Sequence, residues 1–367
     1  MNETPKALTR WFPLVPRARP TCAPLDQRID NVTNMAHCAQ NQAEAAAALN
    51  LTALIASDIG AGDLAVEMCW RQFHAFAERA PLGSVDAGLA MEPIVNLARL
   101  AIREGDGDRA FKILDQALIA ANNAGSVAVN GNTLDFADLT PKAESRHAAR
   151  ERLWIAMLSD GTRALTRAGR WTEALQTVKQ YKGIGERLLD GRQTAIITHY
   201  TTGDLTSAIT MIADTAVIDS WEQVLALYLE TCCAIASGTA NVRSCSVLVR
   251  QVLQLELPSE QRLFQIRLGL SILELAHLID ADTELLVKEF GNVALQTGDA
   301  YAARDLVNDR NFMLLGQSEI LPALRKLESK SGLSLEVVSN LPWQRLNIAF
   351  DVGLARLHSV IGEVGVT

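Results

Sequence analysis

Apolar residues recur along this chain at the three- and four-residue spacing of amphipathic helices, with short polar breaks between the runs. One phrase recurs at the breaks: a glycine, usually a charged residue next, and an alanine a few positions later. It is found at Gly62, Gly107, Gly169, Gly203 and Gly298. Glycine suits the left-handed or tight backbone positions between antiparallel helices. The pattern therefore predicts an all-α chain built from antiparallel helix pairs.

The spacing of the breaks indicates a repeat. Gly169, Gly203 and Gly238 lie 34 and 35 residues apart. This period is typical of stacked helix-turn-helix units that bury their apolar faces against one another. We expect a solenoid of antiparallel helix pairs over residues 26–310. Residues 1–25 carry five prolines and predict a flexible or strap-like arm, and residues 311–367 predict a helical cap.

The limits of the individual helices follow from the same periodicity and from capping residues. We expect helices over 45–56, from 63 onward, 86–103, 107–123, 143–168, 171–183, 185–199, 207–217, 221–237, 242–255, 258–277, 283–297, 299–309 and 342–361. Weak alternation over 332–338 predicts a short extended piece.

One stretch departs from the helical pattern. Residues 126–136 alternate apolar and polar positions around Asn130-Gly131, the pair that a type I′ turn prefers because both of its central residues need positive φ. The stretch predicts a small β-hairpin. In a solenoid, such an insertion (126–138) projects from one face and gates a binding surface, or is a plain surface loop.

Composition narrows the class of protein. Of 367 residues 49% are apolar and only 5% aromatic, which favours an interior of Ala, Leu, Ile and Val. The net charge is −8, and the thin basic start (Arg10, Arg17, Arg19) is the only candidate for nucleic acid, so we expect no direct nucleic-acid binding. No run approaches the roughly 20 apolar residues of a membrane span, and no signal peptide is evident. We expect a cytoplasmic protein without membrane contact.

Motifs for catalysis or metal binding are absent from the sequence. The six cysteines and six histidines show no metal-ligand spacing, and no nucleophile motif occurs. Gly183-Ile184-Gly185 lacks the lysine and hydroxyl residue of a phosphate loop and predicts a turn. We therefore expect neither a cofactor nor a metal.

Nine residues remain as candidates for binding. Asp190 and Arg192 flank a glycine and form either a rigid fork for a carboxylate or phosphate, or a simple surface pair. His199 lies two turns further on, so it points the same way. Trp70 and Arg71 stack a ligand or belong to the core. Arg99 and Arg163 are arginines that could meet acidic groups of a partner. Asn130 and Asp135 belong to the expected hairpin.

The segment Gly169-Arg170-Trp171-Thr172-Glu173-Ala174-Leu175 resembles a tetratricopeptide repeat, and the likeness extends over about residues 40–310. Trp171 through Gln193 is also similar to uncharacterised helical-repeat proteins of actinobacteria, a likeness that implies no activity. The resemblance to the repeat family implies a solenoid whose concave groove binds a peptide or senses a small signal.

These observations favour a non-catalytic interaction protein with a protein or peptide partner. Two alternatives stay open. One is a regulator that responds to a small molecule, and the other is an enzyme or enzyme subunit of a biosynthetic pathway that uses Asp190, Arg192 and His199. A homodimer is possible in each case.

Overall fold

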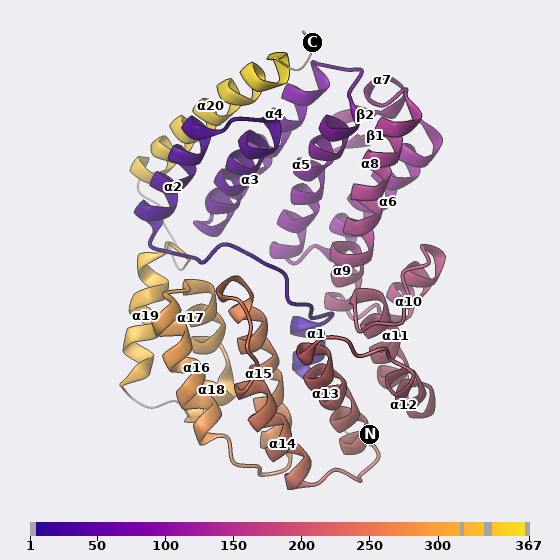
Figure 1. Ribbon diagram of the computed structural model, residues 1–367, viewed down its shortest axis with the longest axis vertical. Coiled ribbons are helices and arrows are strands. Elements are labelled where there is room, and N and C mark those ends of the chain that lie inside the picture. Colours follow the sequence, from indigo (N-terminus) through magenta and orange to yellow (C-terminus); the bar gives the residue numbers. More distant parts are fainter. Residues whose placement is uncertain (1–4, 316–318, 334–339, 364–367) are drawn as a thin grey trace. The chain divides into compact units, whose positions relative to one another are not determined.

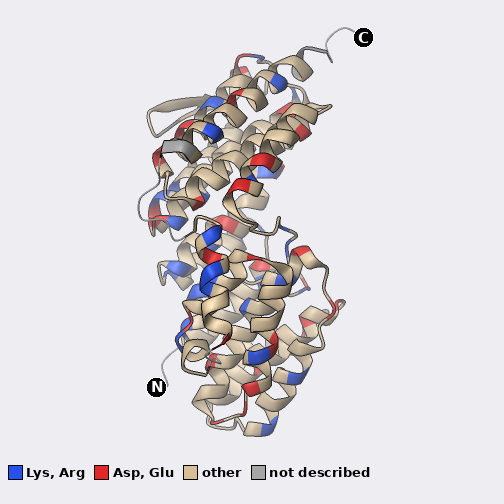
Figure 2. Ribbon diagram, turned by 90° about the vertical axis from the view of Figure 1, so that its left-hand side faces the viewer, with Lys and Arg blue, Asp and Glu red and all other residues tan. Residues whose placement is uncertain are grey.

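The computed structural model describes residues 5–315, 319–333 and 340–363, and its helices make up most of the described chain, as predicted (Figure 1). The chain divides into two compact units. Unit 1 combines the N-terminal segment up to Ala23 with Leu165–Leu333, and unit 2 combines Pro24–Ala164 with the chain from Ser334 onward. Basic and acidic positions are interspersed on the helices of both units (Figure 2).

Unit 2 is built from long helices that pack on their neighbours in chain order. Its elements are α2 (Leu25–Cys38), α3 (Gln42–Asp58), α4 (Gly62–Ala77), α5 (Ser84–Arg103), α6 (Gly107–Asn123), β1 (Ser126–Val129), β2 (Asn132–Asp135), α7 (Phe136–Leu139), α8 (Ala143–Ala156), a π-helical turn (Met157–Gly161), the start of α9 (Thr162–Arg167) and α20 (Asn340–Glu363). Alanines such as Ala45, Ala87 and Ala98 are buried where the helices meet. Small side chains at these positions let the helices approach closely.

Unit 1 has shorter helices in the same sequential arrangement. They are α1 (Lys6–Trp11), the end of α9, α10 (Trp171–Gln180), α11 (Asp190–Thr201), α12 (Leu205–Ala213), α13 (Ser220–Ala236), α14 (Val242–Leu253), a 3₁₀ turn (Ser259–Gln261), α15 (Arg262–Leu278), α16 (Glu284–Thr297), α17 (Ala300–Val307), α18 (Arg310–Leu315) and α19 (Ile320–Lys330). Tyr228 is fully buried and stacks on Phe12 with ring centroids 5.2 Å apart.

The N-terminal segment packs into unit 1. The Glu274 carboxylate accepts the N–H groups of Lys6 and Ala7 at 2.8 and 2.7 Å, and so satisfies the first donors of α1. Leu8 and Phe12 are fully buried. The predicted arm therefore contains a short helix and core side chains, because its apolar residues find partners far away in sequence.

The hairpin prediction is confirmed. β1 and β2 pair antiparallel, with Val129 opposite Asn132, and Asn130 and Gly131 have φ of 49° and 81°. These are the positive values that a type I′ turn needs.

The repeat glycines turn the chain as expected from Gly169 onward. Gly169, Gly203 and Gly298 have φ between 64° and 84°. In the first two breaks the left-handed residue is instead Gly60 or Gly105, two positions earlier, while Gly62 and Gly107 open the next helices.

Most predicted limits differ from the structure by a few residues, and three differences change the layout. Residues 185–189 are a loop, and α11 begins only at Asp190. Residues 143–168 are interrupted by the π-helical turn. The predicted cap over 311–367 is divided, because α18 and α19 belong to unit 1 whereas α20 belongs to unit 2 and packs on α2 and α3. The extended piece expected over 332–338 lies mostly outside the described residues. Among the helices described, none is long and apolar enough to cross a bilayer.

Candidate functional site

A line of polar side chains follows one face of α5 in unit 2. Glu92, Asn96, Arg99 and Arg103 follow one another at spacings of four, three and four residues, so they lie on one face of the helix. Asn50 of α3 joins them through a hydrogen bond described below. We call Asn50, Asn96, Arg99 and Arg103 the donor strip.

Arg99 is held by a buried carboxylate from the π-helical turn. Its Nε and Nη2 lie 3.0 and 2.9 Å from Oδ2 of Asp160, which is only 8% exposed. Burial by itself lowers the pKa of Arg99, but the Asp160 charge and hydrogen bond outweigh it, and the pKa is raised. Arg99 is therefore fixed in its charged form.

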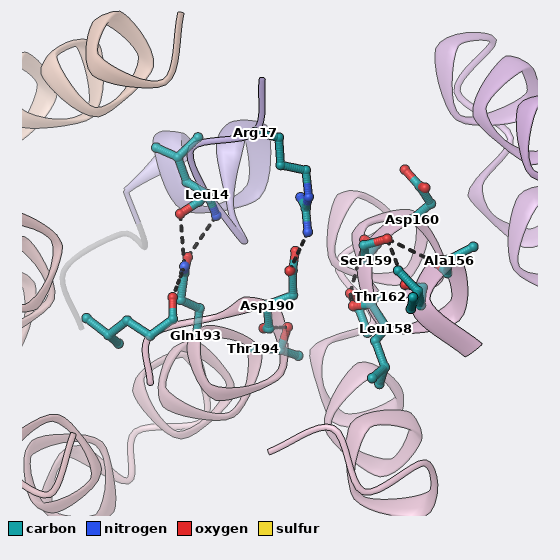
Figure 3. Close-up of polar contacts among 12 residues, drawn as sticks. Leu14, Arg17, Ala156, Leu158, Ser159, Asp160, Thr162, Asp190, Gln193 and Thr194 are labelled. Carbon is teal, nitrogen blue, oxygen red and sulfur yellow. Dashed lines mark hydrogen bonds and ion pairs between the residues drawn. The ribbon is translucent and has the colours of Figure 1, made fainter. Parts of the chain in front are cut away.

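The π-helical turn is stabilised by hydroxyl groups of its own segment. Ser159 donates to the carbonyl of Ile155 at 2.9 Å. Thr162 donates to the carbonyl of Leu158 at 2.6 Å (Figure 3). These bonds satisfy carbonyls in a segment where the α-helical ladder changes register. The π-helical turn is thus a stable local structure that positions Asp160.

The chemistry of Arg99 also orients the two asparagines. A guanidinium has donors only, so the atom that Arg99 Nη1 meets at 3.2 Å must be the Asn96 oxygen. Asn96 Nδ2 then donates to Asn50 Oδ1 at 2.8 Å. Asn50 is left with an NH₂ group for which the described residues provide no acceptor. Both asparagine oxygens of the strip thus accept hydrogen bonds from within it, whereas the Asn50 NH₂ group is available to a ligand.

Arg103 completes the strip with an open edge. Its Nη1 donates to Ser57 Oγ and Asp58 Oδ1 at 2.8 and 2.9 Å. The Asp58 side chain is only 2% exposed and also pairs with Arg28. Within the described chain, no acceptor meets Nε or Nη2 of Arg103, and its side chain is 37% exposed. This edge can bind a carboxylate or phosphate through two parallel hydrogen bonds.

The opposite end of the α5 face is closed by an ion pair. Arg152 of α8 binds both oxygens of Glu92, with Nη2 2.8 Å from Oε2. The carboxylates along this face, those of Glu92, Asp160 and Asp58, are thus all engaged by arginines.

Of the predicted binding residues, two lie at this part of unit 2. Arg99 belongs to the strip, and the half-buried Arg163 follows Asp160 by three residues in α9. Four residues of this region are not among those predicted from the sequence: Asn50, Asn96, Arg103 and Asp160. The spacing of polar residues within the apolar helix α5 was the signal that could have identified Asn96 and Arg103.

The predicted aromatic and hairpin residues have structural surroundings. Trp70 is buried in the core edge-on to Phe73, with ring centroids 5.8 Å apart, and Arg71 pairs with Asp351 of α20 at 2.6 Å. Asn130 forms the hairpin turn, and Asp135 caps α7 by accepting the N–H of Ala137 at 2.9 Å.

The three residues of the proposed enzymatic site have separate partners in unit 1. Asp190 pairs with Arg17 at 2.5 Å (Figure 3), and His199 lies 3.1 Å from Asp204. Arg192 is buried and donates to Thr215 Oγ1 at 2.8 Å and to the carbonyls of Gly185 and Met211 at 2.8 and 2.9 Å. Among the hydrogen bonds of the described chain, none joins two of these three residues.

Arg192 instead holds a loop. A Cβ added at Gly191 would lie 2.1 Å from the Gly183 carbonyl oxygen, so only glycine permits this close approach of loop and helix. The loop over 183–189 and α11 are thereby locked together.

Two further findings bear on function. Across the part of the chain that the structure describes, no group of three or more His, Cys, Asp and Glu side chains could hold a metal ion. No protein-family model, curated protein or solved structure matches this chain.

Proposed function

We propose that this protein is a non-catalytic interaction module that binds an acidic peptide segment of a protein partner on the donor strip of unit 2. The observation that carries the proposal is the polarity of the strip. Asn50 and Arg103 both present N–H groups outward, while the acceptors around them are already bonded. A ligand that supplies carbonyl and carboxylate oxygens is complementary to this surface.

The strip suits a peptide because it combines two kinds of donor. The Asn50 amide matches a main-chain carbonyl, and the open edge of Arg103 matches a carboxylate. Asp160 and Asp58 hold the two guanidiniums in place before a ligand arrives, which reduces the entropy lost on binding.

The proposal includes a solenoid architecture of the tetratricopeptide type within the helical units. The packing of successive helices on one another in chain order supports it. In such an array the side chains of alternate helices share one surface, which is how α3 and α5 both contribute to the strip.

A displayed library of short random peptides tests the proposal. We expect the enriched peptides to carry Asp or Glu, and we expect Arg103→Gln and Asn50→Asp each to weaken binding of a synthetic enriched peptide about ten-fold, measured by titration calorimetry. Asn50→Asp keeps the oxygen that accepts from Asn96 and replaces only the outward donor by a repelling carboxylate, so the fold is retained.

Arg109→Gln is the matched control. Arg109 is an exposed arginine of α6 whose acidic partner, Glu104, is also exposed, and it is not part of the strip. Its substitution should leave peptide affinity unchanged. Enrichment of peptides without acidic residues, or affinity insensitive to both strip variants, would rule the proposal out.

A further inference from the structure

Five arginines from distant parts of the sequence converge inside unit 1. Arg10 and Arg19 come from the N-terminal segment, and the others come from α9, α15 and α17: Arg167, Arg267 and Arg304. We call these five residues the arginine cluster. It does not overlap the donor strip, and the inference below is independent of the proposed function.

Two aromatic rings hold four of the guanidiniums. Arg10 and Arg267 lie over the Trp11 ring, 4.3 and 4.8 Å from its centroid. Arg19 and Arg304 lie beside Tyr301 at 4.1 and 5.3 Å. Stacking on a ring fixes a guanidinium while leaving the N–H groups at its edge available.

The carboxylates near the cluster are few and mostly occupied. Asp305 pairs with Arg267 at 2.8 Å and with Arg304 at 3.5 Å, and is only 5% exposed. Asp309 lies 3.8 Å from Arg10 but also caps α18, accepting the N–H of Phe312 at 3.0 Å. Asp299 accepts the N–H of Cys22 at 3.0 Å.

The charge balance of the cluster is positive. Five guanidiniums face the three carboxylates of Asp299, Asp305 and Asp309, an excess of two. Glu328 also faces Arg304, but Arg325 beside it offsets its charge. An excess of this kind attracts a dianion or a more highly charged anion.

Two members of the cluster lack a carboxylate partner. The described residues offer no hydrogen-bond acceptor to the Arg19 guanidinium, and Arg167 reaches only the Arg10 carbonyl, at 3.5 Å. The pKa of Arg19, which is half-buried, is lowered by burial and by the charge of Arg267. Arg167 is more exposed, and partial desolvation together with the charges of neighbouring arginines lowers its pKa. Since arginine does not lose its proton in proteins, both groups stay charged without full compensation.

We propose that the arginine cluster binds the phosphate groups of a small polyphosphate anion. A tetrahedral phosphate accepts hydrogen bonds from several guanidiniums at once, and a diphosphate carries enough charge to neutralise the excess of two. Because guanidiniums already lie over the Trp11 and Tyr301 rings, recognition is directed at the phosphates and not at a stacked base.

Titration calorimetry on the full-length chain tests this inference with three probes: inorganic pyrophosphate, tripolyphosphate and ATP. We expect all three to bind, affinity to rise from pyrophosphate to tripolyphosphate, and affinity to fall as salt is raised. ATP that binds no more tightly than tripolyphosphate identifies the phosphates as the recognised group. Much tighter binding of ATP overturns the assignment to phosphate alone.

Arg167→Gln and Arg19→Gln should each weaken tripolyphosphate binding about ten-fold, because each removes a charge that lacks a carboxylate partner. Arg250→Gln, which changes an exposed arginine of α14 outside the cluster, is the matched control and should bind normally. Circular dichroism and melting temperature without ligand show whether each variant is folded. No binding of any probe by the unaltered chain, or equal binding by all three variants, would overturn the proposal.

Discussion

Arg99 of unit 2 and Arg19 of unit 1 have opposite surroundings. In unit 2, Arg99, Arg103 and Arg28 each pair with a buried carboxylate, and the pKa of Arg99 is raised. In unit 1, Arg19 stacks on an aromatic ring instead, and its pKa is lowered. A paired arginine contributes to the stability of the fold, whereas an incompletely compensated one keeps N–H groups available to an anion, as proposed for the arginine cluster. The donor strip is therefore held in place by ion pairs before a ligand binds, whereas the arginine cluster keeps an excess of positive charge.

The largest expected effect comes from removing the carboxylate shared by two arginines. Asp58→Ala should destabilise unit 2 by about 3–5 kcal/mol, because Arg28 beside it is itself only 8% exposed. Asp305→Ala is the matched change in unit 1 and should cost only about 1–3 kcal/mol, since Arg267 and Arg304 are 21% and 33% exposed and can hydrate. Urea unfolding measures both. Equal losses would contradict the proposed difference between the units.

A second substitution, Gln193→Ala, should loosen the N-terminal segment from the rest of unit 1. Gln193 is fully buried, accepts the N–H of Leu14 at 2.7 Å and donates to the Leu14 carbonyl at 2.9 Å (Figure 3). Gln193→Ala should cost about 2–3 kcal/mol, because it leaves both Leu14 groups without this partner. It should also weaken tripolyphosphate binding, since the segment supplies Arg10 and Arg19.

Gln180→Ala changes an exposed glutamine at the end of α10 and serves as the control. Limited proteolysis followed by mass spectrometry should find faster cleavage before Ala23 only in the Gln193 variant. Unchanged cleavage there would mean that other contacts suffice to hold the segment.

A smaller effect compares one arginine from each unit directly. Arg99→Gln should destabilise the chain by about 1–2 kcal/mol, because it removes charge-assisted bonds to Asp160 that solvent partly screens. Arg19→Gln should change stability by about 0.5 kcal/mol or less, because lost stacking is offset by relief of repulsion from Arg267. The melting temperatures of the two variants, measured at equal salt, test this difference. A larger decrease for Arg19→Gln than for Arg99→Gln would contradict it.

The cysteines report on each unit without changing its stability. Cys38 is exposed in unit 2, whereas the other five cysteines are buried. Burial raises the pKa of Cys69 to about 12 and that of Cys245 to about 11, so at pH 8 both remain protonated and unreactive. A disulfide reagent should therefore modify one thiol in the folded chain and six after denaturation.

In the Asp58→Ala variant, Cys69 should become reactive before Cys245 of unit 1 does. Mass spectrometry of the labelled peptides identifies the order. Simultaneous labelling of both cysteines would show that the two units open together.

The hydrophobic pattern predicted the limits of a helix well where residues of that helix alone determine them. The expected helix over 107–123 coincides with α6, and that over 86–103 differs from α5 by two residues at its start. The Asn130-Gly131 turn was equally clear because two residues suffice to specify it. The start of α11 was misplaced because Arg192 holds the preceding loop through the Gly185 carbonyl and is itself tied to the Met211 carbonyl of α12, contacts that no local pattern reveals.

The residues of the two candidate sites were harder to predict from the sequence pattern. Arg99 was selected for its charge, but its neighbour Asp160 comes from a turn 61 residues away. The three arginines predicted to be a thin basic start did include Arg10 and Arg19. Nothing in the sequence shows that Arg167, Arg267 and Arg304 join them, since hundreds of residues separate the outermost members.

The sequence by itself determined the helices, their breaks and the hairpin, because hydrophobic periodicity, glycine φ and capping act over a few residues. Only the tertiary structure decided which arginines have a carboxylate within reach and which have an aromatic ring. It also placed α20 on α2 and α3 and the N-terminal segment in unit 1. Electrostatic pairing and burial depend on distance in space, and chain order does not fix that distance.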